Sequence, residues 1–111
     1  MDLISHILKM YQKGDGHVMV LTASVRNMDH LLYALKLGSD IITVPFNILK
    51  EWGERGLPIP GGDYVYRREN LKGIPLKEID LEKSWQFYDI RHELTEKGME
   101  RFSADWNALI K

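Results

Sequence analysis

With 111 residues, the chain is long enough for one domain with a hydrophobic core. Fifteen lysines and arginines face sixteen aspartates and glutamates, and the formal net charge of -1 excludes a general electrostatic attraction to nucleic acid or to anionic membranes. Cysteine is absent, which excludes disulfides, thiolate nucleophiles and cysteine-bound metals.

The first segments along the chain predict a helix followed by a strand. Residues 2–12 carry apolar side chains at helical spacing, and Gly14 and Gly16 end this pattern. Residues 18–25 then form a nearly continuous apolar run, which is typical of a strand buried on both faces, as in a parallel sheet.

A second helix and a second strand follow. Asn27 is a good N-cap and Gly38 a good C′ residue, so the sequence predicts a helix between them. Residues 41–44 are rich in β-branched side chains and predict the second strand, and Pro45 opens a third helix that extends to residue 52. The order α-β-α-β-α with short links indicates βαβ units, which have right-handed crossovers.

Glycines and prolines interrupt the first part of the next stretch, residues 53–92, where they rule out a long helix and predict an irregular segment. Within it, residues 64–66 suit an edge strand or an extended arm, and residues 78–88 suit a short helix. Its aromatic side chains either pack against the chain's own helices or contact another subunit. They are Tyr64, Tyr66, Trp85, Phe87 and Tyr88.

The last helix is predicted over residues 94–110. Thr95 is the expected N-cap, with Leu94 and Met99 forming a hydrophobic staple around it.

The end of the first predicted strand carries the best candidate site. Alternation of side chains puts Val20, Thr22 and Ser24 on one face, which we expect to line a crevice, and Leu21, Ala23 and Val25 beneath the helices. Ligands of α/β folds bind at the carboxyl ends of strands. Ser24, Arg26 and the helix N-terminus capped by Asn27 together suit a phosphate group, and a solvated arginine at a polar strand end is the simpler alternative.

The sequence gives little indication of metal binding, Schiff-base catalysis or membrane insertion. The four histidines do not pair at metal-ligand spacing, so we expect no metal and no cofactor. None of the nine lysines falls on a predicted strand, where burial would lower the pKa of a Schiff-base amine. No apolar run approaches the ~20 residues of a membrane span, and no basic segment precedes a signal-like stretch, so we expect a soluble cytoplasmic protein.

Three segments resemble the transaldolase and fructose-6-phosphate aldolase family. They are Val-Leu-Thr-Ala-Ser-Val-Arg-Asn at 20–27, Asp-Ile-Ile-Thr-Val-Pro at 40–45, and Leu-Thr-Glu-Lys-Gly-Met-Glu-Arg-Phe at 94–102 followed by Asp105 and Trp106. The opening residues 1–4 are similar to the helix that precedes the seventh strand in that family.

The resemblance implies a fold class. The family folds as a (β/α)8 TIM barrel of about twice this length, and residues 18–25 and 40–44 match its seventh and eighth strands. The chain is then a partial barrel of α/β class, with two parallel strands, an inserted segment and a C-terminal helix. The implied organisation is βα units over 1–52, an irregular insertion over 53–92, where the family usually has a short link, and the C-terminal helix over 93–111.

The resemblance also implies a function in sugar-phosphate metabolism. Family members cleave or transfer a dihydroxyacetone unit through a Schiff base on a lysine of the fourth strand, supported by carboxylates on earlier strands. None of these groups falls within the matched segments, so the isolated chain is expected to be inactive. The resemblance implies that Ser24 and, less directly, Arg26 bind the phosphate group of the substrate.

Two alternatives stay open. The chain is an oligomerising fragment or assembly module without catalytic activity, or a small binder of phosphate ligands. Two strands alone leave open edges, so we expect a homo-oligomer or a contact with the missing N-terminal barrel portion.

Overall fold

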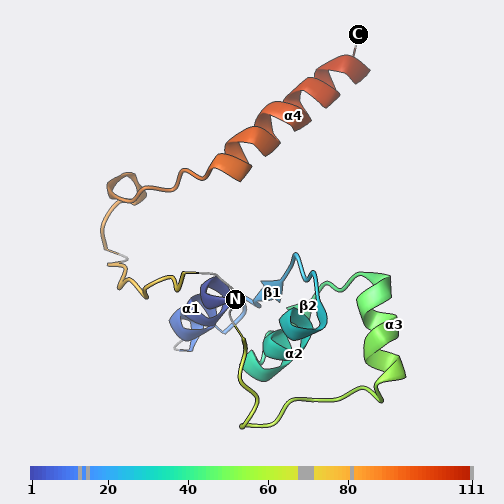
Figure 1. Ribbon diagram of the computed structural model, residues 1–111. Coiled ribbons are helices and arrows are strands. Elements are labelled where there is room, and N and C mark those ends of the chain that lie inside the picture. Colours follow the sequence, from blue (N-terminus) through green and yellow to red (C-terminus); the bar gives the residue numbers. More distant parts are fainter. Residues whose placement is uncertain (13, 15, 68–71, 81, 111) are drawn as a thin grey trace. The chain divides into compact units, whose positions relative to one another are not determined.

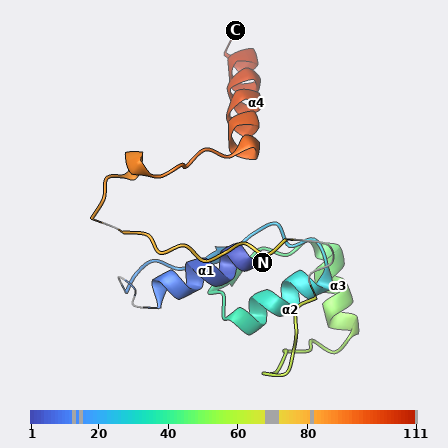
Figure 2. The same cartoon turned by 60° about the vertical axis from the view of Figure 1, so that its left-hand side comes forward.

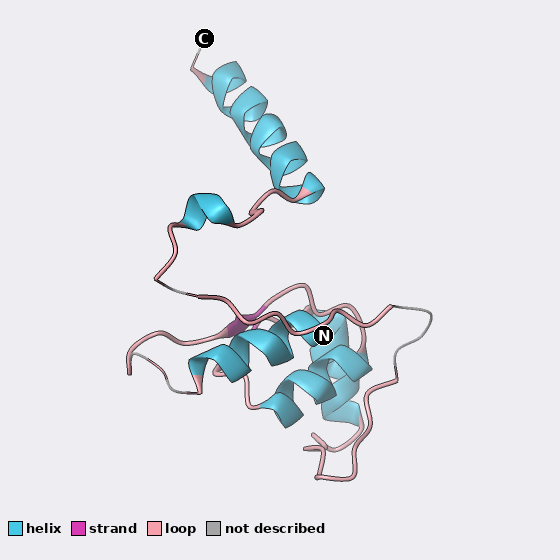
Figure 3. Cartoon of the chain, turned by 90° about the vertical axis from the view of Figure 1, so that its left-hand side faces the viewer, coloured by secondary structure: helices cyan, strands magenta, loops and turns pink. Residues whose placement is uncertain are grey.

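The computed structural model describes residues 1–12, 14, 16–67, 72–80 and 82–110. These residues fall into two compact units, Met1–Leu76 and Lys77–Lys111. Helices make up far more of the first unit than strands do (Figures 1 and 3). The division of the chain into 1–52, 53–92 and 93–111 stays a prediction.

The first unit has the predicted order of helices and strands, although its strands are much shorter than the apolar runs that contain them. In chain order, the elements are α1 (Asp2–Tyr11), β1 (Leu21–Thr22), α2 (Met28–Leu37), β2 (Ile41–Ile42) and α3 (Phe46–Glu54).

The two strands pair in parallel, as predicted, with Leu21 opposite Ile41 and Thr22 opposite Ile42. The N–H of Thr43 donates to the carbonyl of Thr22 at 2.9 Å and continues this ladder. Because both strands run in the same direction, their carboxyl ends lie at the same edge of the sheet.

Local chemistry fixes both ends of α2. The side chain of Asn27 accepts the N–H of His30 at 2.9 Å, which confirms the predicted N-cap. Gly38 takes a left-handed conformation with φ of 71°, and the N–H of Ser39 donates to the carbonyl of Ala34 at 3.2 Å. This Schellman-type ending confirms Gly38 as the C′ residue and turns the chain into β2.

The core of the first unit lies between α2, α3 and the strand ends. Helices α1 and α3 both contact α2, and α1 runs beside α2 (Figures 1 and 2). The buried cluster joins side chains of the loop after β1, of α2 and of α3, and burial of such side chains contributes about 1.5–3 kcal/mol each. Its members are Val25, Met28, Leu31 and Ile48.

The predicted faces of the first strand are largely wrong. Thr22 is only 1% exposed and Val20 is also buried, whereas Leu21 is 46% exposed and Ala23 is exposed. The register partner of Thr22, Ile42, packs against the core cluster, so the face that carries Thr22 is the one that the helices cover. Of the predicted helix-facing residues, only Val25 is buried, because the backbone changes conformation at Ser24.

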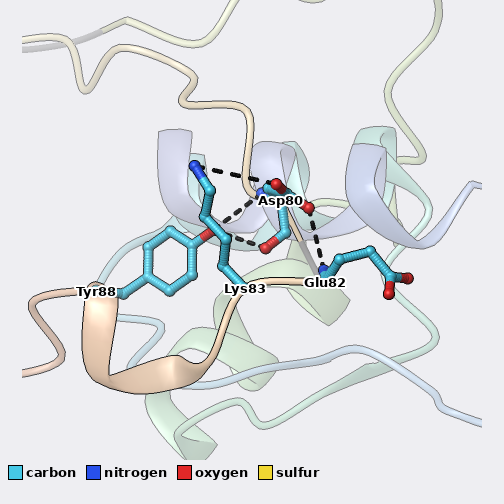
Figure 4. Close-up of polar contacts among 4 residues, drawn as sticks. All are labelled: Asp80, Glu82, Lys83 and Tyr88. Atoms are coloured by element: carbon cyan, nitrogen blue, oxygen red, sulfur yellow. Dashed lines mark hydrogen bonds and ion pairs between the residues drawn. The ribbon is translucent and has the colours of Figure 1, made fainter.

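In the second unit, the predicted helix over 78–88 is wrong for the described residues, which exclude Leu81. Only Trp85–Phe87 forms a 3₁₀ turn. Figure 4 shows why: the carboxylate of Asp80 accepts the N–H of Glu82 at 3.1 Å, and the Tyr88 hydroxyl donates to the Asp80 carbonyl at 2.7 Å. An aspartate that bonds its own backbone two residues on favours a turn over a helix.

Helix α4 (Glu93–Leu109) agrees with the predicted last helix in extent but not in its cap. The ring of His92 accepts the N–H of Leu94 at 3.2 Å, and His92 is therefore the N-cap. Thr95 lies inside the helix, so its predicted role as N-cap is wrong. Glu93 and Glu96 occupy the first turn, where a negative charge favours the helix dipole.

Candidate functional site

Ser24 lies at the carboxyl end of β1, beside the carboxyl end of β2. It is exposed and lines a cavity of about 260 Å³ together with the residues that follow β2. The parallel register brings these segments together, because Thr43 directly follows the residue that pairs with Thr22. The other lining residues are Val25, Thr43, Val44 and Pro45.

The backbone of Ser24 is unusual. Its φ is 58°, in the left-handed region that costs an L-residue about 1–2 kcal/mol. This conformation ends the strand and resets the alternation of faces, so that Val25 enters the core directly after an exposed Ser24. Strained residues of this kind cluster at binding sites, which makes the outlier a hint of function.

Arg26 lines a second and larger cavity of about 650 Å³. This cavity lies between the first turn of α2, helix α3 with its C-cap Arg55, and the segment at Tyr66 and Arg67. The structure therefore brings Ser24 and Arg26 to the same strand end, but they line two different cavities.

The N-terminus of α2 is already hydrogen-bonded within the chain. While the side chain of Asn27 accepts the N–H of His30, the Nδ1 atom of His30 accepts the N–H of Arg26 at 3.3 Å. Asn27 caps the helix, and His30, at the third helical position, bonds the residue that precedes the cap, whereas the Glu or Gln of a capping box bonds the N–H of the cap residue itself. Partial burial, then the charges of the Met1 ammonium and Arg26, lowers the pKa of His30 below 6.5.

A strap, defined as residues 62–66, runs along the outer surface of α2. Lys36 Nζ donates to the carbonyl of Gly62 at 2.9 Å and to that of Tyr64, and the Tyr64 hydroxyl donates to Asp29 Oδ1 at 2.9 Å. The ring of Tyr66 stacks on that of Tyr33, with centroids 4.8 Å apart and an angle of 21°. The strap is the predicted extended arm rather than an edge strand, and its tyrosines pack on the chain's own helix.

The carboxylates that line the larger cavity are occupied. Glu51 forms an ion pair with Arg55, the C-cap of α3, and Asp29 accepts the Tyr64 hydroxyl. Burial of Tyr64, followed by its hydrogen bond to Asp29, raises the pKa of Tyr64 to about 12. The Tyr64 proton therefore stays on the strap at neutral pH.

Sequence reasoning missed His30, the strap and the polar link between the strands. His30 had one local signal, its place three residues after a capping asparagine. Among the described residues there is no group of three or more His, Asp or Glu that could hold a metal ion. The described lysines all lie outside β1 and β2, while Lys13 and Lys111 lie outside the described residues.

Within the described parts of the chain, no helix is both long enough and apolar enough to cross a membrane.

A family model and several curated proteins are similar to this chain, and all of them point to the same family. The family model described as Transaldolase/Fructose-6-phosphate aldolase matches residues 1–111. A "Probable transaldolase" of Myxococcus xanthus is 30% identical over 112 residues, covering 100% of this chain and 34% of that protein. A "Probable transaldolase" of Roseiflexus sp. (strain RS-1) is 30% identical over 108 residues, covering 97% of this chain and 33% of that protein.

A shorter match has higher identity. A "Probable transaldolase" of Chlorobium chlorochromatii is 41% identical over 51 residues, covering 46% of this chain and 23% of that protein. No solved structure matches. The chain spans about a third of the length of the curated relatives that match it end to end.

The long matches correct one expectation. The Myxococcus protein aligns with 100% of this chain, so residues 53–92 have a counterpart there. The expectation that this stretch departs from the family is therefore wrong for relatives of this kind.

Proposed function

This chain belongs to the transaldolase/fructose-6-phosphate aldolase family, and we propose that it supplies the phosphate side of a sugar-phosphate site in a (β/α)8 barrel. In this proposal β1 and β2 correspond to the seventh and eighth strands of the barrel. The phosphate binds at the end of β1, where Ser24 contacts it from the smaller cavity and Arg26 from the larger one. The Schiff-base lysine belongs to a part of the protein outside this chain.

The observation that carries the proposal is the cavity shared by Ser24 and Thr43. It supports a site at the carboxyl ends of two adjacent parallel strands, which is where barrel enzymes bind their substrates. In many barrels the loops that follow strands seven and eight hold a phosphate. The serine hydroxyl can donate one hydrogen bond to a phosphate oxygen, and the arginine supplies a fixed positive charge.

The lysines of the chain support the idea that its reactive amine lies elsewhere. A Schiff-base lysine needs a lowered pKa from burial or a neighbouring cation. Lys36 instead holds two strap carbonyls, and Lys97 is paired with Glu93 on the surface of α4. Borohydride treatment with fructose 6-phosphate should therefore leave the chain unmodified, and a covalent adduct on any lysine would refute this assignment.

Calorimetry with fructose 6-phosphate tests the binding role. Ser24→Ala and Arg26→Met should each weaken binding by about tenfold, the equivalent of one hydrogen bond to a charged group. Ser103→Ala, which changes an exposed serine of α4, is the matched control and should bind as the unmodified chain does. Equal affinity of all four proteins would remove Ser24 and Arg26 from the site.

A second candidate function is that of a non-catalytic assembly module, alone as a homo-oligomer or with the N-terminal portion of a barrel. It is favoured by the apolar side chains of α4, among which Phe102 is 72% and Trp106 is 63% exposed. Large exposed apolar patches mark interaction surfaces. Light scattering at micromolar concentration tests the homo-oligomeric form: a stable oligomer that dissociates in Phe102→Ser supports it, and a clean monomer contradicts it.

A further inference from the structure

The larger cavity contains an arginine to which the phosphate assignment gives no role. Arg67 directly follows the strap and lines the same cavity of about 650 Å³ as Arg26. The two arginines are 41 positions apart in the sequence, and the strap and the loop after β1 bring them to one place. Both side chains are exposed, so a ligand from solvent can reach them.

The charges around this cavity are unequal. Three arginines line it, and of its two carboxylates Glu51 is paired with Arg55 and Asp29 accepts the Tyr64 hydroxyl. Within the described residues, neither Arg26 nor Arg67 has a carboxylate at ion-pair distance. The cavity therefore has two guanidinium groups available for an anion from outside the chain.

The strap anchors the chain directly before Arg67, whether or not a ligand is bound. Tyr66, the preceding residue, stacks on Tyr33, and Tyr64 is tied to Asp29 and Lys36 of α2. A side chain whose neighbours are already ordered loses less entropy when it binds. Guanidinium groups match the geometry of phosphate and carboxylate oxygens, and two of them suit a doubly charged phosphate monoester.

We propose that Arg67 is a specificity-determining residue that binds the phosphate group of the substrate together with Arg26. The proposal rests on the proposed function, since it takes the ligand to be a sugar phosphate, but it adds a residue from the strap. The strap then acts as one wall of the phosphate site, and its attachment to α2 sets the position of the second guanidinium.

The test is calorimetric titration of the full chain with fructose 6-phosphate and, separately, with inorganic phosphate. We expect Arg67→Met to weaken binding of both ligands by about tenfold, as loss of one charged contact predicts, and Arg67→Lys to recover part of the affinity. Arg101→Met, which changes an exposed arginine of α4, should leave both affinities unchanged. Thermal melting should be the same for the three variants and the unmodified chain, because Arg67 has no described hydrogen bond or ion pair.

The possible failures are distinct. Unchanged affinity in Arg67→Met, with weaker binding in Ser24→Ala, overturns the role of Arg67 and leaves the proposed function intact. Unchanged affinity in both variants overturns the two proposals together. Loss in Arg67→Met without recovery in Arg67→Lys, combined with a lower melting temperature, means that Arg67 acts through folding and also overturns its assignment to the phosphate.

Discussion

The Nδ1 atom of His30 accepts the backbone N–H of Arg26, while the N–H of His30 itself donates to Asn27. The ring can accept this hydrogen bond only in its neutral form, because both ring nitrogens of a charged imidazole are donors. One titratable ring thus joins the cap of α2 to the residue proposed to bind phosphate.

This relationship predicts a pH-dependent stability. The pKa of His30 is lowered in the folded state, chiefly by burial, so the unfolded chain binds the proton more tightly. The stabilisation is complete above the unfolded value of 6.5 and is lost as pH falls through the folded pKa. Melting followed by circular dichroism from pH 7.5 to 5 should show a falling transition temperature.

The control for this prediction is His30→Gln, in which the side chain can cap the helix but cannot titrate. Its transition temperature should fall less steeply over the same range. Parallel slopes for the two proteins would assign the pH dependence to other groups.

The hydrogen bond between the buried hydroxyl of Thr22 and the half-buried Ser39 predicts a specific energetic coupling. Thr22 Oγ1 donates to Ser39 Oγ at 2.8 Å, and Ser39 Oγ lies within hydrogen-bond distance of the carbonyls of Val20 and Ile41. Ser39→Ala would leave the hydroxyl of Thr22, which is 1% exposed, without this partner and should cost about 1–3 kcal/mol of unfolding free energy.

Urea denaturation of a double-mutant cycle measures this coupling. Thr22→Val in the Ser39→Ala background should recover part of the loss, because removing both partners leaves no unsatisfied group. Strict additivity of the two substitutions would show that the hydroxyls do not act as a pair.

The parts of the fold that sequence could predict are those fixed by local chemistry. Asn27 and Gly38 act at one helix end each, through backbone groups only a few residues away, and both assignments are correct. The parallel pairing of the two strands also followed from their apolar runs and the helix between them.

The parts that failed depend on distant contacts. Alternation along a strand states which residues share a face, but not which face the helices cover, and so Thr22 was assigned to the wrong side. The left-handed residue Ser24 also broke the alternation without any glycine to signal it. The strap bonds to α2 across 26 to 35 positions, a pairing that no local pattern contains.

Attachment of the strap predicts an alkaline transition. The pKa of Tyr64 is raised from 10 to about 12, first by burial and then by its hydrogen bond to Asp29, so the folded state favours the neutral phenol. The corresponding stabilisation is present below pH 10 and is lost as pH rises from 10 through 12. In the absorbance of tyrosinate, the step of Tyr64 should come late, and Tyr64→Phe should remove that step.

Asp29→Asn gives a second check on the strap. The amide cannot repel a phenolate as the carboxylate does, so the late step should move to lower pH. A late step that persists in Tyr64→Phe would belong to another tyrosine.

The left-handed backbone of Ser24 predicts a separation of stability from binding. Ser24→Ala keeps the φ of 58° and its cost, whereas Ser24→Gly removes the steric strain and has higher backbone entropy in the unfolded state. Relief of the strain stabilises the glycine variant and the backbone entropy destabilises it. We expect the glycine variant to be more stable than the alanine variant by about 0.5–1 kcal/mol.

Both variants lack the hydroxyl, so both should bind fructose 6-phosphate equally weakly. Urea denaturation and calorimetry on the same two proteins measure the two quantities. Recovery of binding in the glycine variant would mean that the backbone conformation at the strand end, rather than the serine hydroxyl, holds the phosphate.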